Sequence, residues 1–376
     1  MTTRLMHGHV LDVLTRLPDE SVHMVWTSPP YWGLRCYGLP PVTWPSGWSG
    51  EHGLEPTLDL WLEHEVSVFR EVRRVLRSDG TLWLNCGDCY ASSVNGRPAE
   101  EVEDDDRTFR DKPFSTVGGV FKPKDRIGLP HRLVFALQAD GWWWRDEIVW
   151  RKPNPMPSSV KDRTTPAHEM LFMLTKAQRY FYDHLAVLEP FADDRQGRDG
   201  STLASQRDRG GRTDGYTKPN GIDPSANGGR QKRSVWTHAT QPYPGAHFAT
   251  APTAVVKPCI LAGTSQAGVC PHCGAPQWRV TRDGTGETLG WRPGCACEPA
   301  LPVPAVVLDP FGGVGSTAMA AEQLGRDAIL IELSPAYAFD ALARLRSHLV
   351  RVKHDLVVRY SDDDLPLFRG AGEAAE

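Results

Sequence analysis

The stretch from Val306 to Glu332 constrains the fold of this chain of 376 residues more than any other segment. It indicates an apolar strand ending in Asp309, a glycine-rich turn over residues 310–315, a helix, and a second apolar strand ending in Glu332. Glycines let the backbone pass close to a ligand, and the following helix offers free amide groups. An acid about 20 residues beyond the glycines can reach ribose hydroxyls. The segment therefore predicts a nucleoside-cofactor site, with a purely structural turn as the alternative.

The rest of the chain continues this alternation of strands and helices. Helices are expected at residues 7–17, 58–76, 128–141 and 253–261, and strands at residues 22–27, 81–86 and 142–150. Hydrophobic residues make up 40% and charged residues 23% of the chain, which excludes wholly disordered, coiled-coil and collagen-like proteins. We expect an α/β fold in which helices cover both faces of a largely parallel sheet.

A rigid polar segment, Ser28-Pro29-Pro30-Tyr31, directly follows the first of these strands. Open α/β sheets bind ligands at the carboxyl ends of their strands. The prolines fix the carbonyl groups of Ser28 and Pro29 as hydrogen-bond acceptors. Acceptors aimed at the hydrogens of a nucleobase amine favour the pyramidal, nucleophilic nitrogen, and Tyr31 can stack on a base flipped out of a duplex. The segment predicts chemistry on a nucleobase amine, with a proline-rich structural turn as the alternative.

Together these segments resemble the amino-group DNA methyltransferases of the beta arrangement, in which the catalytic half precedes the S-adenosylmethionine half. The resemblance runs from about Gly8 to Leu345, outside the insertions. It includes two further motifs, Trp150-Arg151-Lys152-Pro153-Asn154 with His168-Glu169 downstream, and His247-Phe248-Ala249-Thr250-Ala251-Pro252. It implies a Rossmann-like methyltransferase sheet in circularly permuted order, with a loop-rich target-recognition region.

The resemblance also implies roles for individual residues. The target base would lie beside the Trp150 motif. The catalytic residues would be Ser28, Pro29, Pro30 and Tyr31. S-adenosylmethionine would be bound through its ribose by Glu332, and through its methionine part by Asp309, Phe311, Gly312, Gly313, Gly315, Ser316 and Thr317, with contacts from Phe248 and Thr250.

In this family Ser-Pro-Pro-Tyr occurs mostly with cytosine N4 and Asp-Pro-Pro-Tyr mostly with adenine N6, so Ser28 favours methylation of a flipped cytosine at N4. Elementary chemistry leaves adenine N6 open, because both bases offer an amine beside a ring acceptor. The chain departs from many relatives at Gly8-His9, where they have Gly-Asp and the acid touches the cofactor adenine. Asp12 is a candidate to replace that acid.

Other kinds of function fit the sequence less well. Methylation of cytosine C5 needs a cysteine nucleophile. The Pro258-Cys259 pair precedes the glycine turn inside an expected helix, so Cys259 is expected to be a packed thiol. A non-catalytic DNA-binding module is disfavoured by the intact Ser28, Tyr31 and Asp309. A methyltransferase of protein or RNA amides is disfavoured only weakly, by an arginine-bearing loop.

Two close cysteine pairs flank a segment rich in turn residues: Cys270 with Cys273, and Cys295 with Cys297. Pro271 within the first pair and Gly274 after it suit a zinc-knuckle turn. We expect one structural Zn²⁺ in a closed site of four thiolates, with His272 as a substitute ligand and free thiols as the alternative. Cys86 and Cys89 form a third close pair without a partner pair and are expected to be packed thiols.

The arginine-bearing loop, residues 191–234, lies where the family keeps its target-recognition region. Arginine pairs with guanine and any cation attracts phosphate. The candidate DNA-binding residues are Arg195, Arg198, Arg207, Arg209, Arg212, Arg230, Lys232 and Arg233. A solvated linker is the alternative, because aspartates cancel much of the field and the net charge of the chain is −4. Double-stranded DNA is the expected partner, and a cognate restriction endonuclease is a candidate partner.

These predictions divide the chain into six parts: a catalytic half at 1–185 with an insertion at 92–125 that is expected to be mobile, a target-recognition region at 186–240, a cofactor-side helix segment at 241–265, a zinc knuckle at 266–300, an S-adenosylmethionine-binding half at 301–360 and an acidic tail at 361–376. No apolar run reaches the roughly 18 residues of a membrane span, and the first residues show no signal-peptide pattern. We expect a cytoplasmic protein without a membrane partner.

Overall fold

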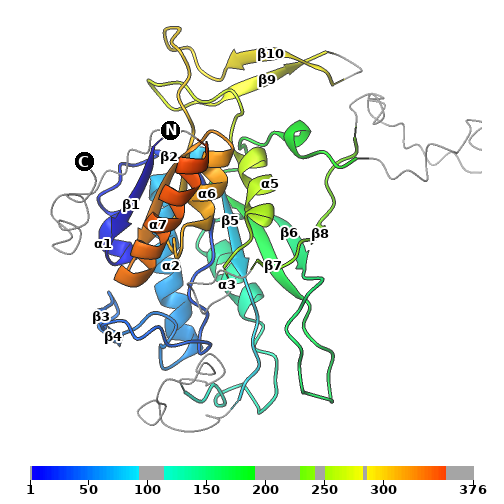
Figure 1. The fold of residues 1–376 in the computed structure, drawn as a ribbon. Coiled ribbons are helices and arrows are strands. Elements are labelled where there is room, and N and C mark those ends of the chain that lie inside the picture. Colours follow the sequence, from blue (N-terminus) through cyan, green and yellow to red (C-terminus); the bar gives the residue numbers. More distant parts are fainter. Residues whose placement is uncertain (1, 93–113, 191–228, 242–249, 283–285, 353–376) are drawn as a thin grey trace, which may run out of the picture.

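The computed structural model describes residues 2–92, 114–190, 229–241, 250–282 and 286–352. Its main strands are β1 (Thr3–His7), β2 (Val22–Thr27), β5 (Leu76–Cys86), β6 (Trp143–Arg151), β7 (His168–Thr175), β8 (Val235–Thr237), β11 (Val306–Asp309) and β12 (Asp327–Glu332). They form one eight-stranded sheet in the order β1-β12-β11-β2-β5-β7-β6-β8 (Figure 1). The first five strands in this order are parallel, β7 is antiparallel to both neighbours, and β8 is parallel to β6.

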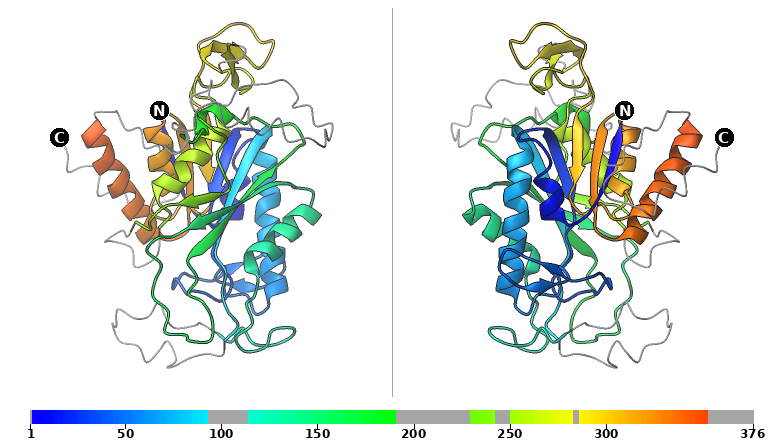
Figure 2. Two further views of the ribbon diagram at one scale, coloured as in Figure 1. Left: turned by 90° about the vertical axis from the view of Figure 1, so that its right-hand side faces the viewer. Right: turned by 90° about the vertical axis from the view of Figure 1, so that its left-hand side faces the viewer.

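Helices cover both faces of this sheet (Figure 2). One face carries α1 (Val10–Leu14), α2 (Leu58–Val75) and α3 (Leu129–Ala139), and the other carries α5 (Thr253–Gly263), α6 (Ser316–Gln323) and α7 (Pro335–Val352). Each face has its own buried apolar cluster, with Phe69 and Leu133 in the first and Val256 and Ala320 in the second. The expected α/β sheet covered on both faces is confirmed. Among the described helices, none combines the length and apolar character needed to cross a membrane.

The last β-α-β unit of the chain, β11-α6-β12, lies between β1 and β2 in the sheet order. β11 pairs with β2, with Leu308 opposite Val25, and β12 pairs with β1. The chain leaves β11 for α6 on one face, whereas it connects β2 to β5 by way of α2 on the opposite face. The carboxyl ends of β11 and β2 therefore border a topological switch point, where open α/β sheets bind ligands. This is the permuted arrangement expected from the sequence.

Three details differ from the sequence-based expectation. The patterns predict neither β7 nor β8, and apolar periodicity carries no information on strand direction. β5 begins at Leu76 and includes the turn expected at residues 78–80, where its register against β2 shifts. α1 ends at Leu14, although helical spacing extends to Leu17.

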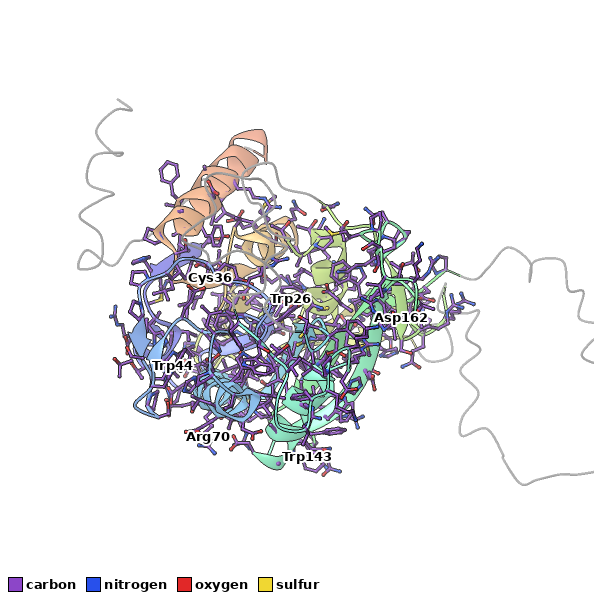
Figure 3. All side chains as sticks on the ribbon, turned by 90° about the horizontal axis from the view of Figure 1, so that it is seen from below. Trp26, Cys36, Trp44, Arg70, Trp143 and Asp162 are labelled. Atoms are coloured by element: carbon purple, nitrogen blue, oxygen red, sulfur yellow. The ribbon has the colours of Figure 1, made fainter. Side chains whose placement is uncertain are left out.

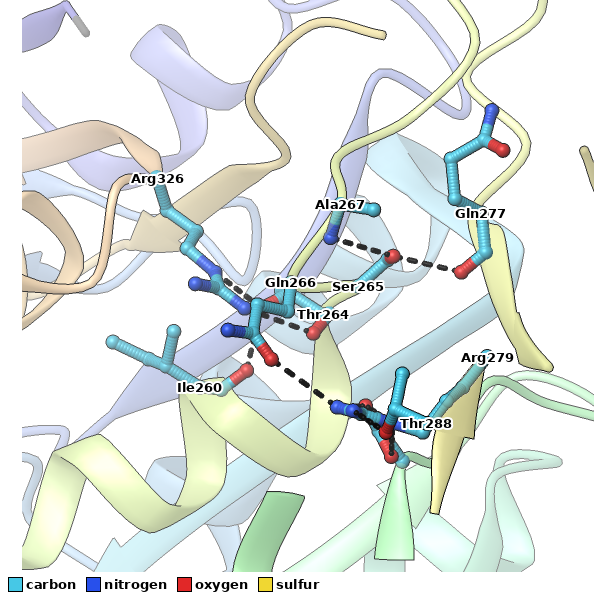
Figure 4. Close-up of polar contacts among 10 residues, drawn as sticks. Ile260, Thr264, Ser265, Gln266, Ala267, Gln277, Arg279, Thr288 and Arg326 are labelled. Atoms are coloured by element: carbon cyan, nitrogen blue, oxygen red, sulfur yellow. Dashed lines mark hydrogen bonds and ion pairs between the residues drawn. The ribbon is translucent and has the colours of Figure 1, made fainter. Parts of the chain in front are cut away.

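A small hairpin of β9 (Gln277–Thr281) and β10 (Thr288–Pro293) stands beyond the amino ends of the central strands, next to the end of α5 (Figures 1 and 4). Arg279 of β9 makes an ion pair with the buried Asp183, with Nη2 and Oδ2 2.7 Å apart. Ser265, just after α5, donates a hydrogen bond to the carbonyl of Gln277 (2.7 Å). These contacts fix the hairpin to the start of η3 and to the segment after α5. The remaining short elements are β3 (Val42–Thr43), β4 (Ser49–Gly50) and the 3₁₀ helix η3 (His184–Val187).

Candidate active site

The carboxyl ends of the central strands surround a cavity of about 300 Å³, and Trp26 is one of its lining residues. Figure 3 shows the molecule from this side, with Trp26 labelled near the middle of the view. The cavity brings together the two segments singled out in the sequence, which lie far apart in the chain. The predicted site residues that line it are Ser28, Pro29, Pro30, Tyr31, Thr250, Asp309, Phe311, Gly312, Gly313, Ser316, Thr317 and Glu332. Gly315 is not in the lining, and Phe248 lies outside the described residues.

Asp309 links the two halves of the site. Its carboxylate accepts hydrogen bonds from the hydroxyl of Thr27 at the end of β2 (2.8 Å) and from the hydroxyl of Thr317 in α6 (2.6 Å). The Phe311 amide donates a third (3.1 Å). Burial raises the pKa of Asp309 to about 7. Because Thr27 immediately precedes Ser28, Asp309 ties the start of the proline segment to the glycine turn. The role of Thr27 was not predicted from the sequence.

The glycine turn is held against β12 by Glu332. The Gly313 amide donates to Oε2 of Glu332 (2.8 Å), and the Ser334 amide donates to Oε1 (2.7 Å). Gly313 and Gly315 have φ of 50° and 79°, in the left-handed region that favours glycine. A Cβ on Gly312 would lie 2.9 Å from the Leu330 side chain. The turn therefore needs glycine for its backbone path and for its close approach to β12.

The proline segment presents oxygen atoms to the cavity. The hydroxyls of Ser28 and Tyr31 lie 2.9 Å apart. Trp61 of α2 donates its indole N–H to the Pro30 carbonyl (3.0 Å), whereas the carbonyls of Ser28 and Pro29 accept no hydrogen bond among the described residues. Burial, together with the charge of Glu169, raises the pKa of Tyr31 well above its usual value, so the phenol stays protonated.

A loop at residues 51–55 holds the chain directly after the proline segment. The Gly53 carbonyl accepts a hydrogen bond from the Gly33 amide (2.8 Å), and the Glu55 carbonyl accepts one from the Trp32 indole (2.8 Å). Burial raises the pKa of the Glu55 carboxyl to about 7. Glu51 accepts hydrogen bonds from backbone amides of residues 37 and 39, which line the cavity. The sequence shows no periodicity here, so this support was not predicted.

The structure does not bring Asp12 to the cavity. Asp12 is exposed on α1 and is absent from the cavity lining, whereas Gly8 and His9 line it. Burial lowers the pKa of His9, which favours its neutral ring. The ring atom Nε2 of His9 is buried and has no hydrogen-bond partner among the described residues. The hypothesis that Asp12 takes the place of the missing acid is therefore wrong.

The candidate DNA-binding cations are only partly described. Arg195, Arg198, Arg207, Arg209 and Arg212 lie outside the described residues. The other three converge on the carboxylate of Glu189, at 3.5 Å from Arg230, 3.8 Å from Lys232 and 3.0 Å from Arg233. The side chain of Arg233 is nevertheless 67% exposed. Glu189 therefore offsets part of the positive charge expected for this region.

The four predicted metal ligands lie together. The sulfur atoms of Cys270, Cys273, Cys295 and Cys297 are all within 4.8 Å of one another. His272 does not belong to this group. Hydrogen bonds from the Cys273 and His272 amides lower the pKa of Cys270 to about 6, which favours the thiolate.

The first cysteine turn is attached to the amino ends of the central strands. Arg77 of β5 donates a hydrogen bond to the Cys273 carbonyl (2.6 Å). His23 of β2 accepts the Val306 amide at Nδ1 (3.0 Å), so its Nε2 carries the hydrogen that the Gly274 carbonyl accepts (3.0 Å). Burial, with the nearby charge of Arg77, lowers the pKa of His23 to about 4. The cysteine group thus lies at the amino ends of the central strands, whereas the cavity lies at their carboxyl ends.

The other cysteines expected to be packed thiols are confirmed as buried. Cys259 lies inside α5 and is fully buried. Burial raises its pKa well above the usual value, so it remains a thiol. Cys86 and Cys89 are also buried, and neither belongs to the cysteine group near β9.

Comparisons with known proteins agree with this geometry. Residues 22–342 match the N6/N4 family model described as DNA methylase. The type II methyltransferase M.Cfr9I of Citrobacter freundii is 39% identical over 342 residues, which are 91% of this chain and 87% of the relative. The type II methyltransferase M.XycI of Xanthomonas campestris pv. cyanopsidis is 38% identical over 351 residues, 93% and 90% of the two chains. The solved PvuII DNA methyltransferase (cytosine-N4-specific) shares the fold, with a TM-score of 0.53 and 15% identity over 93% of each chain.

Proposed function

This chain belongs to the N6/N4 DNA methylase family, and we propose that it transfers a methyl group from S-adenosylmethionine to the N4 amine of a cytosine flipped out of double-stranded DNA. One observation carries the proposal. Ser28 and Pro29, whose carbonyls accept no hydrogen bond among the described residues, line the same cavity as the glycine turn after β11. The cavity can therefore hold an amine and a nucleoside-bearing methyl donor next to each other.

The residues present fit S-adenosylmethionine. The glycine turn offers close backbone approach, and Ser316 begins α6, where amides are free to bind a ligand. Glu332 lines the cavity at the end of β12, where its carboxylate can accept hydrogen bonds from ribose hydroxyls. When bound, S-adenosylmethionine supplies an electrophilic methyl group on its sulfonium sulfur.

The protein residues prepare the amine for direct attack. The Ser28 hydroxyl and the Pro29 carbonyl would accept the two amine hydrogens, which withdraws the nitrogen lone pair from the ring and aims it at the methyl carbon. Tyr31 stacks on the base and orients the Ser28 hydroxyl. Attack by N4 on this methyl carbon would form the new C–N bond while the C–S bond breaks, and the leaving group would be a neutral thioether. The resulting N4 cation is strongly acidic and loses its proton to water or to Ser28.

The choice of cytosine rests on Ser28. This chain has serine at the first position of the motif, where the members of the family that methylate adenine N6 mostly have aspartate. The experiment is a product analysis. The purified protein is incubated with methyl-labelled S-adenosylmethionine and unmethylated DNA, and the DNA is digested to nucleosides that are separated by mass. Labelled N4-methylcytosine is the expected product. Labelled N6-methyladenine would contradict the proposed base, and absence of label would favour a non-catalytic DNA-binding protein.

We also propose that the four cysteines hold one structural Zn²⁺. Zinc binds thiolates at about 2.3 Å in a tetrahedron, which puts the sulfurs about 3.8 Å apart. The four sulfurs, all within 4.8 Å of one another, fit this arrangement. Four protein ligands leave no open position for a water or a substrate, so the ion would stabilise the knuckle and take no part in methyl transfer.

We further propose that the region at residues 186–240 contacts the DNA. Among its described cations, the exposed Arg233 is best placed to reach a phosphate. Its Nε lies 3.0 Å from the carboxylate of Glu189, and the arginine side of this ion pair is open to solvent. Replacement of Arg233 should weaken DNA binding at all sequences alike, because phosphate contacts carry no sequence information.

A further inference from the structure

The reaction described above leaves a charged pair in the cavity wall without a role. Lys152 follows β6, and Glu169 lies in β7 opposite Trp150. Their side chains form an ion pair, and only 15% and 22% of their surfaces are exposed. Both residues line the cavity. Removing two charges partly from water costs free energy, which their mutual attraction does not always repay. A role for the pair in binding a ligand would explain why it lies in the cavity wall.

The pair lies on the catalytic side of the cavity. A Cβ added to Gly87 would come within 2.8 Å of the Tyr31 ring and 3.5 Å of the carboxyl carbon of Glu169, so both side chains lie next to Gly87. The Tyr31 hydroxyl lies 2.9 Å from the Ser28 hydroxyl. Lys152 and Glu169 are therefore neighbours of the segment that would hold the target amine.

Lys152 is held in place from two directions. Its Nζ lies 4.5 Å from the ring centroid of Trp150, whose indole N–H is bonded to the His238 carbonyl (2.9 Å). Glu169 accepts one of the three ammonium hydrogens. Nζ has no other hydrogen-bond partner among the described residues, so two donors remain for a ligand.

The Watson–Crick edges of the two candidate bases differ in what they offer these donors. With the amine held at Ser28, cytosine presents two successive acceptors, N3 and O2. Adenine presents N1 followed by a C2–H group, which cannot accept. An ammonium group with two free donors matches cytosine, and it would keep one donor unpaired against adenine, at a cost in a water-poor site.

We infer that Lys152 binds N3 and O2 of the flipped cytosine and that Glu169 is the positioning residue for Lys152. The inference rests on the proposed function and identifies the group that selects the base. The carboxylate of Glu169 also has an electronic effect. A lone cation at N3 would draw electron density away from N4, and the neighbouring negative charge offsets this effect on the nucleophile.

The test combines a protein variant with a base analogue. The methylation site is first mapped on DNA modified by the wild-type protein, and duplexes are made with cytosine or 3-deazacytosine, which lacks the N3 acceptor, at the target position. Methyl transfer is measured for wild type, Lys152→Met, Glu169→Gln and the control Lys161→Met, which removes an exposed lysine from the same β6–β7 connection. The preference is the ratio of kcat/KM for cytosine to that for 3-deazacytosine.

We expect Lys152→Met to lower kcat/KM on cytosine about tenfold or more and to reduce the wild-type preference by a similar factor, because a charged hydrogen bond to the base is lost. Glu169→Gln should reduce the preference in the same direction, which a merely structural role would not do. Lys161→Met should keep it. An unchanged preference in Lys152→Met would overturn the inference.

A second readout separates the base from the cofactor. The Kd of S-adenosylmethionine, measured by calorimetry without DNA, should stay within about threefold in Lys152→Met. A tenfold weaker Kd would show that the lysine binds the cofactor carboxylate and would also overturn the inference. A wild-type product of N6-methyladenine would contradict the proposed function itself, whereas N4-methylcytosine with no change in preference would contradict only this inference.

Discussion

The carboxyl ends and the amino ends of the central strands, called here the carboxyl edge and the amino edge, differ in how their polar groups are used. At the carboxyl edge, the carbonyls of Ser28 and Pro29 accept no hydrogen bond among the described residues, and the buried Nε2 of His9 has no partner there either. At the amino edge, His23 bonds the backbone of Gly274 and Val306, and Arg77 donates to the Cys273 carbonyl and to the carboxylate of Asp79. Buried polar groups are normally paired, so the unpaired carbonyls of Ser28 and Pro29, two residues that line the cavity, are available to a ligand.

This difference separates two uses of polar chemistry in one fold. The cysteine group and its hairpin are tied to the sheet, and they are expected to affect stability alone. The cavity residues keep acceptors open at some cost in stability, and they are expected to affect methyl transfer first. Substitutions at the two edges should therefore give opposite patterns of activity and stability.

The largest effect is expected for Tyr31→Ala at the carboxyl edge. The loss of the stacking ring and of the partner of Ser28 should lower kcat by about 100-fold or more, since the base is no longer held for attack. Tyr31→Phe keeps the ring and should lose less. Turnover and the Kd of S-adenosylmethionine are measured together, and a weaker Kd with unchanged kcat would place Tyr31 in the cofactor site instead.

The next effect is expected for Cys295→Ser at the amino edge. Loss of one thiolate should release about one zinc ion per chain and lower the free energy of unfolding by on the order of 3 kcal/mol. Metal analysis and thermal unfolding measure the two results. Cys36→Ser, outside the cysteine group, is the control and should keep the zinc. A native preparation without metal would refute the zinc site.

A pH effect is expected at Asp309, which joins the two halves of the cavity. Burial raises its pKa to about 7, above the value of about 4 in the unfolded chain. Between these values the folded protein holds a proton that the unfolded chain lacks, so the free energy of unfolding should fall as pH rises from about 4 to about 7.

Asp309→Asn removes this contribution and should make the fall shallower by up to about 1.4 kcal/mol per pH unit. Denaturant unfolding across this pH range measures it, with the exposed Asp162→Asn as the control. An identical pH slope in Asp309→Asn and wild type would mean that Asp309 is ionised throughout.

The smallest effect is expected for Arg77→Ala. It removes the hydrogen bond to the Cys273 carbonyl and should lower the free energy of unfolding by about 1 kcal/mol while methyl transfer stays unchanged. Arg282→Ala, whose ion pair with Glu287 is largely exposed, should change stability by less than about 0.5 kcal/mol. A loss of methyl transfer in Arg77→Ala would show that the two edges are coupled.

The parts of the site that could be predicted are those carried by contiguous residues. The glycine turn and the segment at Ser28 each have their functional residues within a few positions of a strand end. Because open α/β sheets bind ligands at the carboxyl ends of their strands, the sequence predicted that the two segments would border one site. The support from Glu55 and Glu51 could not be predicted, because it consists of hydrogen bonds to residues distant in the chain. Asp12 was a wrong choice because α1 turns its side chain to solvent.

The fold shows the same limit. Alternating strand and helix segments predicted a largely parallel sheet covered by helices. This is confirmed for the five neighbouring strands β1, β12, β11, β2 and β5. The antiparallel direction of β7 depends on pairing with β5 and β6, through contacts such as Phe172 with Leu84. Such pairing is a long-range property that local periodicity does not contain.

The most direct test of the account is Ser28→Ala, measured in one preparation for methyl transfer, for S-adenosylmethionine affinity and for thermal stability. We expect methyl transfer to fall by about 100-fold or more, while the Kd of the cofactor and the Tm stay close to those of wild type, because the Ser28 hydroxyl would act on the target amine and not on the cofactor. Unchanged methyl transfer in Ser28→Ala would contradict the assignment of the carboxyl edge as the site of catalysis.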